Sequence, residues 1–238
     1  MNDKSMIMFL LPVLSFVLLP TGAGAGASDD PMLIMLELDQ LEARDFGGDN
    51  EKEWDAQGWI GKDLTKVWMK SEGERASGST KESELQILYG KAVTTYWDFQ
   101  FGVRRDFEPS PSRSWVAIGF QGLAPYFFEI DTALFIGEAG RTALRFEAEY
   151  ELLFTQRFIL TPEIEINMYG RSDPDIRIGS GLSDIEAGLR LRYEIRREFA
   201  PYLGVNWSKR FGRTAELARQ AGDRASDTAL AVGIRAWF

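Results

Sequence analysis

The sequence of 238 residues contains no cysteine and no histidine. These absences exclude disulfide bonds, zinc sites built from Cys and His, cysteine nucleophiles and every catalytic centre that needs a histidine base. Basic residues are fewer than acidic ones, 27 against 36, and the formal net charge is -9. Because nucleic acids are bound through a basic face, we expect no nucleic-acid partner.

Long apolar runs are also scarce, and the clearest one, Met6–Leu19, stands near the amino end. Lys4 precedes it and the small-residue stretch Gly22–Ala27 follows it. The run is shorter than the roughly 20 residues of a membrane-spanning helix, and its flanks are typical of a secretory signal peptide. We therefore expect residues 1–27 to be an export signal and residues 28–238 to form one domain; a retained membrane anchor is the alternative.

From Leu33 onward, apolar and polar residues alternate along nearly every segment. In Leu144–Leu152 one face is entirely apolar and the other carries four charges, and Ile185–Ile195 repeats the pattern. A period of two residues predicts strands with two unlike faces. About twelve such segments are present. They are centred near Leu36, Ala56, Met69, Ile87, Phe101, Ile118, Leu134, Ala148, Ile166, Leu189, Val205 and Val232.

The predicted connections alternate between tight and long. Short turns on one rim and long loops on the other are typical of outer-membrane barrels, in which the short turns face the periplasm. The even strand number fits the same class. The longer, more polar connections are predicted at Asp45–Glu51, Glu74–Ser83, Asp106–Ser114, Gly137–Arg141, Gly170–Ser183 and Arg210–Asp227.

Alternation alone does not say which face points inward, and a soluble barrel with an apolar interior is the alternative. About twelve strands enclose more volume than side chains readily fill, whereas an outward apolar band needs only lipid to cover it. We therefore predict an all-β fold, a transmembrane antiparallel up-and-down β-barrel of about 12 strands with its charged face lining the lumen. Aromatic residues next to the tight turns are expected to form an interfacial girdle: Tyr96, Trp97, Tyr126, Phe127, Phe158, Phe199, Tyr202 and Phe238.

The last predicted strand, Thr228–Phe238, ends on an aromatic residue. This ending is similar to the terminal signal that outer-membrane proteins present to the barrel-assembly machinery. An unpaired strand edge in lipid would leave backbone groups without partners. The last strand is therefore expected to pair with the first, near Leu33–Leu41.

Charged residues on the inner face admit two interpretations. They can form an internal salt-bridge network, or the acidic strip can attract cations and give a selective path. A ladder of carboxylates alternating with apolar residues is better explained as lumen lining than as catalysis, so we expect no enzyme. The acidic candidates are Glu129, Asp131, Glu147, Glu149, Glu151, Glu163 and Glu165, and the basic ones are Lys66, Lys70, Arg104, Arg145, Arg190, Arg192 and Arg196.

Several stretches resemble the copper resistance protein B family. The resemblance spans about Met32 to Phe238, and the run Gly179–Trp207 carries it most clearly. Shorter stretches support it at Trp59–Leu64, Ser71–Arg75, Pro111–Arg113 with Trp115, Gln121–Glu129 and Gly140–Arg145.

The resemblance implies a barrel in the outer membrane of a Gram-negative cell that takes part in copper tolerance together with periplasmic copper proteins. We expect the barrel to be monomeric and to act by sequestering copper or by moving it across the membrane. Family members often carry a Met- and His-rich segment ahead of the barrel. Here only Ser28–Pro31 separates the predicted export signal from the first strand, and no His exists. A general small-solute channel or scaffold without a metal role is therefore the alternative.

If the barrel itself handles copper, the ligands must be Met thioethers for Cu(I) or carboxylates for harder ions, since Cys and imidazole are lacking. Met35, Glu37 and Asp39 share one face of the first predicted strand and are the candidate metal ligands. Packing is the competing role for Met35. Met69 and Met168 fall on apolar faces and are expected to contact lipid.

Overall fold

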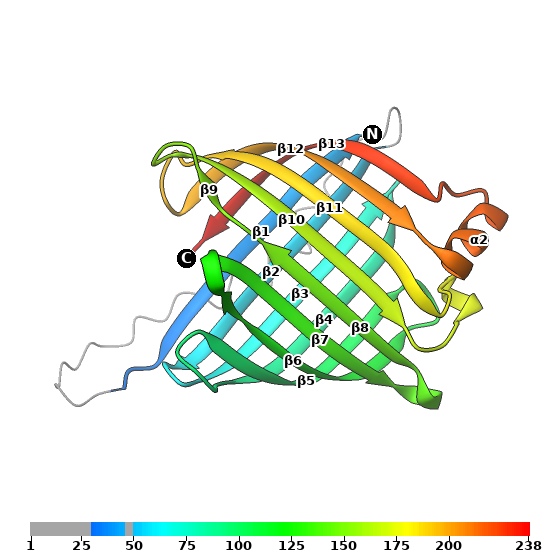
Figure 1. Cartoon of the computed structure of the whole chain (residues 1–238), viewed down its shortest axis with the longest axis horizontal. Coiled ribbons are helices and arrows are strands. Elements are labelled where there is room, and N and C mark those ends of the chain that lie inside the picture. The colour runs from blue at the N-terminus through cyan, green and yellow to red at the C-terminus, as the bar shows by residue number, and fades with distance from the viewer. Residues whose placement is uncertain (1–29, 46–49) are drawn as a thin grey trace. The chain divides into compact units, whose positions relative to one another are not determined.

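The computed structural model describes residues 30–45 and 50–238, so the predicted export signal lies outside the described residues. Met32–Phe238 form one compact unit, a closed antiparallel barrel (Figure 1). β8 and β9 both pair with β10 and form one interrupted strand, so the described barrel has 12 strands, as predicted. The strands are β1 (Leu33–Asp45), β2 (Asn50–Lys62), β3 (Thr65–Ala76), β4 (Ser79–Ala92), β5 (Trp97–Glu108), β6 (Arg113–Ala124), β7 (Phe128–Gly137), β8 (Thr142–Glu149), β9 (Leu152–Leu153), β10 (Phe158–Tyr169), β11 (Gly181–Tyr193), β12 (Phe199–Arg210) and β13 (Ser226–Trp237).

The barrel closes through β1 and β13, which lie side by side in Figure 1. Beyond the end of β13, the backbone N–H of Phe238 donates to the Leu36 carbonyl at 2.8 Å, and the Leu36 N–H donates to the Phe238 carbonyl at 3.0 Å. Closure satisfies the backbone groups that an open edge would leave bare in lipid. The predicted pairing of the last strand with the first is confirmed.

The apolar face of each strand points away from the lumen. In β11, Leu189 and Leu191 are 47% and 41% exposed, whereas Arg190 and Arg192 are each 7% exposed. Met69 behaves as expected, with 44% of its surface on the outside. An outward apolar band around an ionic interior is the arrangement of a membrane barrel.

The aromatic girdle is confirmed with one exception. Tyr126, Phe127 and Phe238 are 82%, 80% and 70% exposed beside the rim of short turns. Tyr202 is only 5% exposed, and its hydroxyl donates to Glu42 in the lumen at 2.8 Å. Closeness to a turn in the sequence does not determine the side of the sheet, and the pleat of β12 places Tyr202 inside.

Most of the connections predicted to be long are short, so this prediction is wrong. Across Glu74–Ser83, β3 and β4 continue to pair, and Ser77 and Gly78 alone make the turn. Of the connections that the structure describes, those at 109–112 and 138–141 are also short, whereas 170–180 and 211–225 are long. Polar residues at these positions predict loops, but the backbone pairing of two strands continues beyond the apolar band without apolar side chains.

Short helices occupy several connections. α2 (Gly212–Gln220) packs its buried Ala215 and Ala218 toward β11. Within the residues that the structure describes, no helix combines the length and the hydropathy needed to cross a bilayer. The 3-10 turns are η1 (Pro125–Phe127), η2 (Glu138–Gly140) and η3 (Pro174–Ile176).

Asp173 anchors the long connection 170–180 to two neighbouring strand ends. Its carboxylate is 2.8 Å from Arg113 and 2.8 Å from Arg141, and the residue is 5% exposed. The hydrogen bond from Arg113, aided by the charge of Arg141, holds the pKa of the Asp173 carboxyl below its ordinary value. The carboxylate therefore stabilises this connection at neutral pH.

We expect Asp173→Asn to lower the hydrogen-exchange protection of the Ile178 amide about tenfold, because a hydrogen bond to a charged group is lost. Since the folded pKa is lowered, the contribution is fully present above the unfolded value of about 3.9 and is lost as pH falls through the folded value. Acidification through the folded pKa, which lies below the ordinary value, should therefore mimic the substitution. Asp175→Asn, at a position 72% exposed, is the control. Equal protection in both variants would contradict the anchoring role.

Candidate functional site

Most of the charged residues predicted for the inner face lie there. Arg196 does not join them, because the alternation of β11 ends at Tyr193 and Arg196 is exposed in the following turn. The structure places the following candidates on the lumen side, by their contacts or by the cavities they line, and their role in an ion path stays a prediction: Glu129, Asp131, Glu147, Glu149, Glu151, Glu163, Glu165, Arg190 and Arg192.

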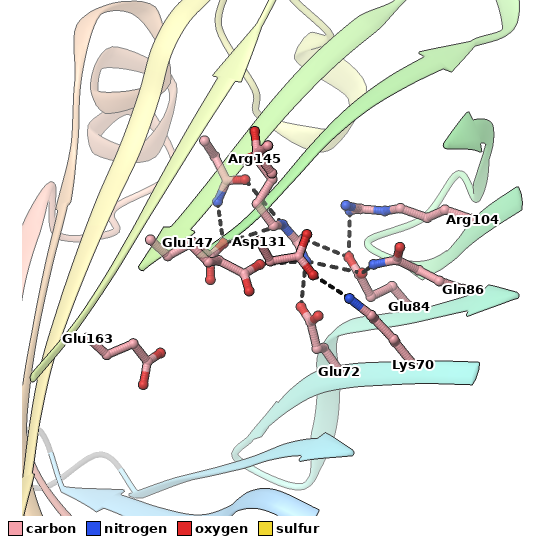
Figure 2. Close-up of polar contacts among 12 residues, drawn as sticks. Lys70, Glu72, Glu84, Gln86, Arg104, Asp131, Arg145, Glu147 and Glu163 are labelled. Carbon is pink, nitrogen blue, oxygen red and sulfur yellow. Dashed lines mark hydrogen bonds and ion pairs between the residues drawn. The ribbon is translucent and has the colours of Figure 1, made fainter. Parts of the chain in front are cut away.

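Arg145 of β8 is at the centre of one group of contacts, which we name the Arg145 cluster (Figure 2). Its guanidinium lies 2.6 Å from Glu72, 2.8 Å from Glu84, 3.5 Å from Glu165 and 3.8 Å from Glu147. Glu72 and Glu84 belong to β3 and β4, which are not neighbours of β8 in the sheet. These bridges therefore cross the lumen.

Two more basic residues secure the same region. Lys70 of β3 pairs with Asp131 of β7, again across the lumen (Figure 2). Arg104 of β5 lies 2.6 Å from Glu84, so that this carboxylate is shared by two arginines. Ion pairs in such a partly dry interior are retained where each charge finds further hydrogen bonds.

Part of the inner wall is apolar, which the alternation did not predict. Phe135 is 1% exposed, and the guanidinium carbon of Arg104 lies 4.6 Å from its ring centroid. Trp68, Leu88 and Trp115 are buried in the same cluster. Attraction of the cation to the aromatic face stabilises this arrangement. Side chains thus fill one side of the lumen.

A bulge in β1 changes which residues face inward. Asp39, between Leu38 and Gln40, has no opposite residue on β2. The extra residue reverses the parity of the strand. Gln40, Glu42 and Arg44 are consequently buried in the lumen, although alternation from the start of the strand predicts them on the outer face.

These β1 residues meet Arg190 of β11 in a second group, which we name the Arg190 cluster. The guanidinium of Arg190 lies 3.1 Å from Glu42 and 2.6 Å from Glu163, and it donates to Gln40 at 2.8 Å. Tyr202 donates to the same Glu42 carboxylate. β1 and β11 are thereby tied together across β12 and β13.

Arg235 of β13 is the centre of a third group near the rim of short turns. Its guanidinium lies 2.9 Å from Glu37 and 3.2 Å from Asp39 of the neighbouring β1. On the opposite wall it lies 3.5 Å from Glu149 and 3.4 Å from Glu151. One cation therefore serves four carboxylates.

The candidate metal ligands are brought to the lumen side, but their carboxylates already have partners. Glu37 and Asp39 pair with Arg235, and Asp39 also accepts a hydrogen bond from Gln57 at 2.9 Å. Met35 shares their face of β1. Within residues 30–45 and 50–238, no group of three or more carboxylates is arranged to hold a metal ion. Copper ligation by these three residues stays a prediction.

A cavity of about 360 Å³ lies in the lumen, with Arg145 and Arg235 among its lining residues. Only Lys70 joins these two arginines as a basic lining residue. Among the described contacts, neither the Asp55 nor the Glu129 carboxylate has a hydrogen-bond or ion-pair partner. Acidic side chains therefore outnumber basic ones around the cavity. Its nine carboxylates are Glu37, Asp39, Asp55, Glu72, Glu129, Asp131, Glu147, Glu149 and Glu163.

Sequence reasoning missed Arg235, Glu42 and Arg44. The alternation of the last strand could have identified Arg235 as a lumen residue, because it lies on the face opposite to the apolar residues Leu230 and Val232. No sequence pattern could have identified Glu42 and Arg44, because a single sequence does not show where a bulge occurs.

Comparison with known proteins supplies a family and a fold. The model for the family described as copper resistance protein B precursor (CopB) matches residues 32–238. The chain is 45% identical over 215 residues to a copper resistance protein B of Escherichia coli, covering 90% of this chain and 73% of that protein. A copper resistance protein B homolog of Pseudomonas syringae pv. tomato is 46% identical over 200 residues, covering 84% and 68%.

Solved structures share the barrel at low sequence identity. A NanC porin superposes with a TM-score of 0.57 at 13% identity, covering 84% of this chain and 98% of that chain. A KdgM porin superposes with a TM-score of 0.51 at 13% identity, covering 86% and 99%. At this identity the likeness concerns the fold alone.

Proposed function

The chain belongs to the copper resistance protein B family and is an exported outer-membrane β-barrel, and from this premise we propose that its acidic lumen binds copper ions and lets them pass. The observation that supports the proposal is the surplus of carboxylates around the cavity. Family membership alone gives the association with copper resistance. The proposal assigns this role to the carboxylates of the lumen.

The surplus has a physical consequence for cations. A carboxylate removed from water is costly unless a cation or a hydrogen-bond donor stands beside it. Arg145 and Arg235 are each shared by four carboxylates, so the fixed cations do not neutralise the cavity. An acidic, partly enclosed space raises the local concentration of mobile cations.

The donor atoms favour the oxidised ion. Oxygen ligands suit harder cations, whereas Cu(I) is selected by thiolate and thioether sulfur. Among the methionines of the described strands, Met69 and Met168 lie on the outer face, and alternation with Glu37 assigns only Met35 to the lumen side. We therefore infer that Cu(II), and not Cu(I), is the ion that the lumen attracts.

Metal titration of the refolded barrel in detergent tests this assignment. We expect Cu(II) to bind at least about tenfold more tightly than Cu(I), a difference of about 1.4 kcal/mol in binding free energy. Isothermal titration calorimetry measures both, with Cu(I) kept reduced under anaerobic conditions. Met35→Leu should leave Cu(II) affinity unchanged. Tighter Cu(I) binding that is lost in Met35→Leu would instead assign the site to the thioether.

A general cation channel without a metal role is the second candidate. It is favoured by the lack, in the described part of the chain, of any carboxylate group arranged to hold a metal ion. Growth of a deletion strain on graded copper separates the two, because a general channel predicts no copper-specific sensitivity. For the copper function, we further propose a monomeric barrel that works with periplasmic copper proteins and is recognised by the assembly machinery through Phe238.

A further inference from the structure

Two cavities of the lumen share Glu37 and Arg235 in their walls. The inner cavity of about 360 Å³ reaches from Arg145 to Arg235. A second cavity of about 150 Å³, which we name the rim cavity, is lined by Arg192 and Trp237 together with the shared pair. The guanidinium of Arg235 lies 2.9 Å from the Glu37 carboxylate. This pair is therefore the wall between the two spaces.

The position of Arg235 places the wall near the periplasmic side. Arg235 stands three residues before the chain end, and β13 pairs there with the start of β1, at Glu37 and Leu38. The short turns and the end of the chain share this rim. The Arg235–Glu37 pair therefore lies between the inner cavity and the rim cavity on the periplasmic side.

The contacts of Arg235 are unequal on its two sides. Toward β1 it donates to Glu37 at 2.9 Å. Toward the opposite wall, its distances to Glu149 and Glu151 are 3.5 Å and 3.4 Å, which are long for charged hydrogen bonds. The bridge across the lumen is thus the weaker half. A mobile cation that reaches Glu149 and Glu151 competes with the guanidinium for these carboxylates.

We propose that Arg235 is the residue that controls cation passage between the inner cavity and the periplasmic rim. It does so in two ways: its side chain blocks the space between the cavities, and its charge opposes the movement of other cations. The inference rests on the proposed function only in assuming that ions cross the lumen, and it does not depend on copper.

Single-channel recording in planar bilayers with KCl alone tests the proposal. Arg235→Ala is expected to raise the K⁺ conductance about threefold and to increase cation selectivity, because both the block and the opposing charge are removed. Arg192→Ala is the matched control. Arg192 lines only the rim cavity, and its loss removes the same charge without opening the wall.

Equal conductance changes in Arg235→Ala and Arg192→Ala, or no change in either, would overturn the proposal. Assembly of each variant is verified by its heat-dependent mobility on gels. Glu37→Gln provides a second route if Arg235→Ala does not assemble, since it loosens the same wall; an unchanged conductance there would also overturn it. Because KCl is the probe, a failure of Cu(II) binding in calorimetry leaves this result intact, and the two failures are distinguishable.

Discussion

Replacing Arg145 by methionine is expected to lower the free energy of unfolding of the barrel by about 3 to 5 kcal/mol, because removing one partner of a buried ion pair leaves its counter-charges uncompensated. Arg145 is 8% exposed and faces Glu72, Glu84, Glu147 and Glu165. Methionine keeps much of the volume and none of the charge. The loss is therefore electrostatic.

Urea unfolding of the refolded barrel in lipid vesicles measures this change through the fluorescence of its tryptophans. Arg105→Met is the matched control, since Arg105 is exposed at the neighbouring position to Arg104 and its hydrogen bonds go to Ser112 and Ser114. A surface change of this kind is expected to stay within about 0.5 kcal/mol. If both variants unfold at the same urea concentration, the Arg145 cluster does not stabilise the barrel.

Neutralising Glu149 and Glu163 together is expected to reduce the cation-to-anion permeability ratio about tenfold, which corresponds to about 1.4 kcal/mol of lost cation stabilisation. Both carboxylates line the inner cavity. Arg190 keeps its contact with Glu42, and Arg235 keeps its contact with Glu37. The double variant, Glu149→Gln with Glu163→Gln, is thus expected to assemble.

Reversal potentials under a KCl gradient give the permeability ratio. The matched control neutralises Glu138 of η2 and Glu216 of α2, two exposed carboxylates. This double substitution removes the same total charge, but outside the lumen. Unchanged selectivity in the lumen variant would favour a purely structural salt-bridge network. A lower conductance to Cu(II) in the lumen variant alone would link the same carboxylates to copper.

The predictions for Arg235 and for the cavity carboxylates are related but separate. Removing the Arg235 charge should favour cations, whereas removing Glu149 and Glu163 should disfavour them. Opposite shifts in the same reversal-potential measurement would show that the fixed charges of the lumen set its selectivity. Shifts in one direction would instead point to a general loss of packing.

The sequence by itself determined the fold class, the strand number and the orientation of the two faces. Each of these follows from a local property, because successive side chains of a strand point to opposite sides. Leu189 to Arg192 illustrate it, with the leucines outside and the arginines inside as alternation requires. The same rule located the acidic strip that lines the cavity.

Only the tertiary structure decided which charges meet. The bulge at Asp39 exchanged the faces of β1, and one added residue of this kind changes every later position of a strand. Arg145 and Arg235 find carboxylates on strands that are distant along the sheet, and these partners are fixed by closure of the barrel. The pleat is a short-range property of the backbone, whereas register and closure depend on the whole chain. The acidic strip could therefore be predicted from the sequence, and the contacts between its charges could not.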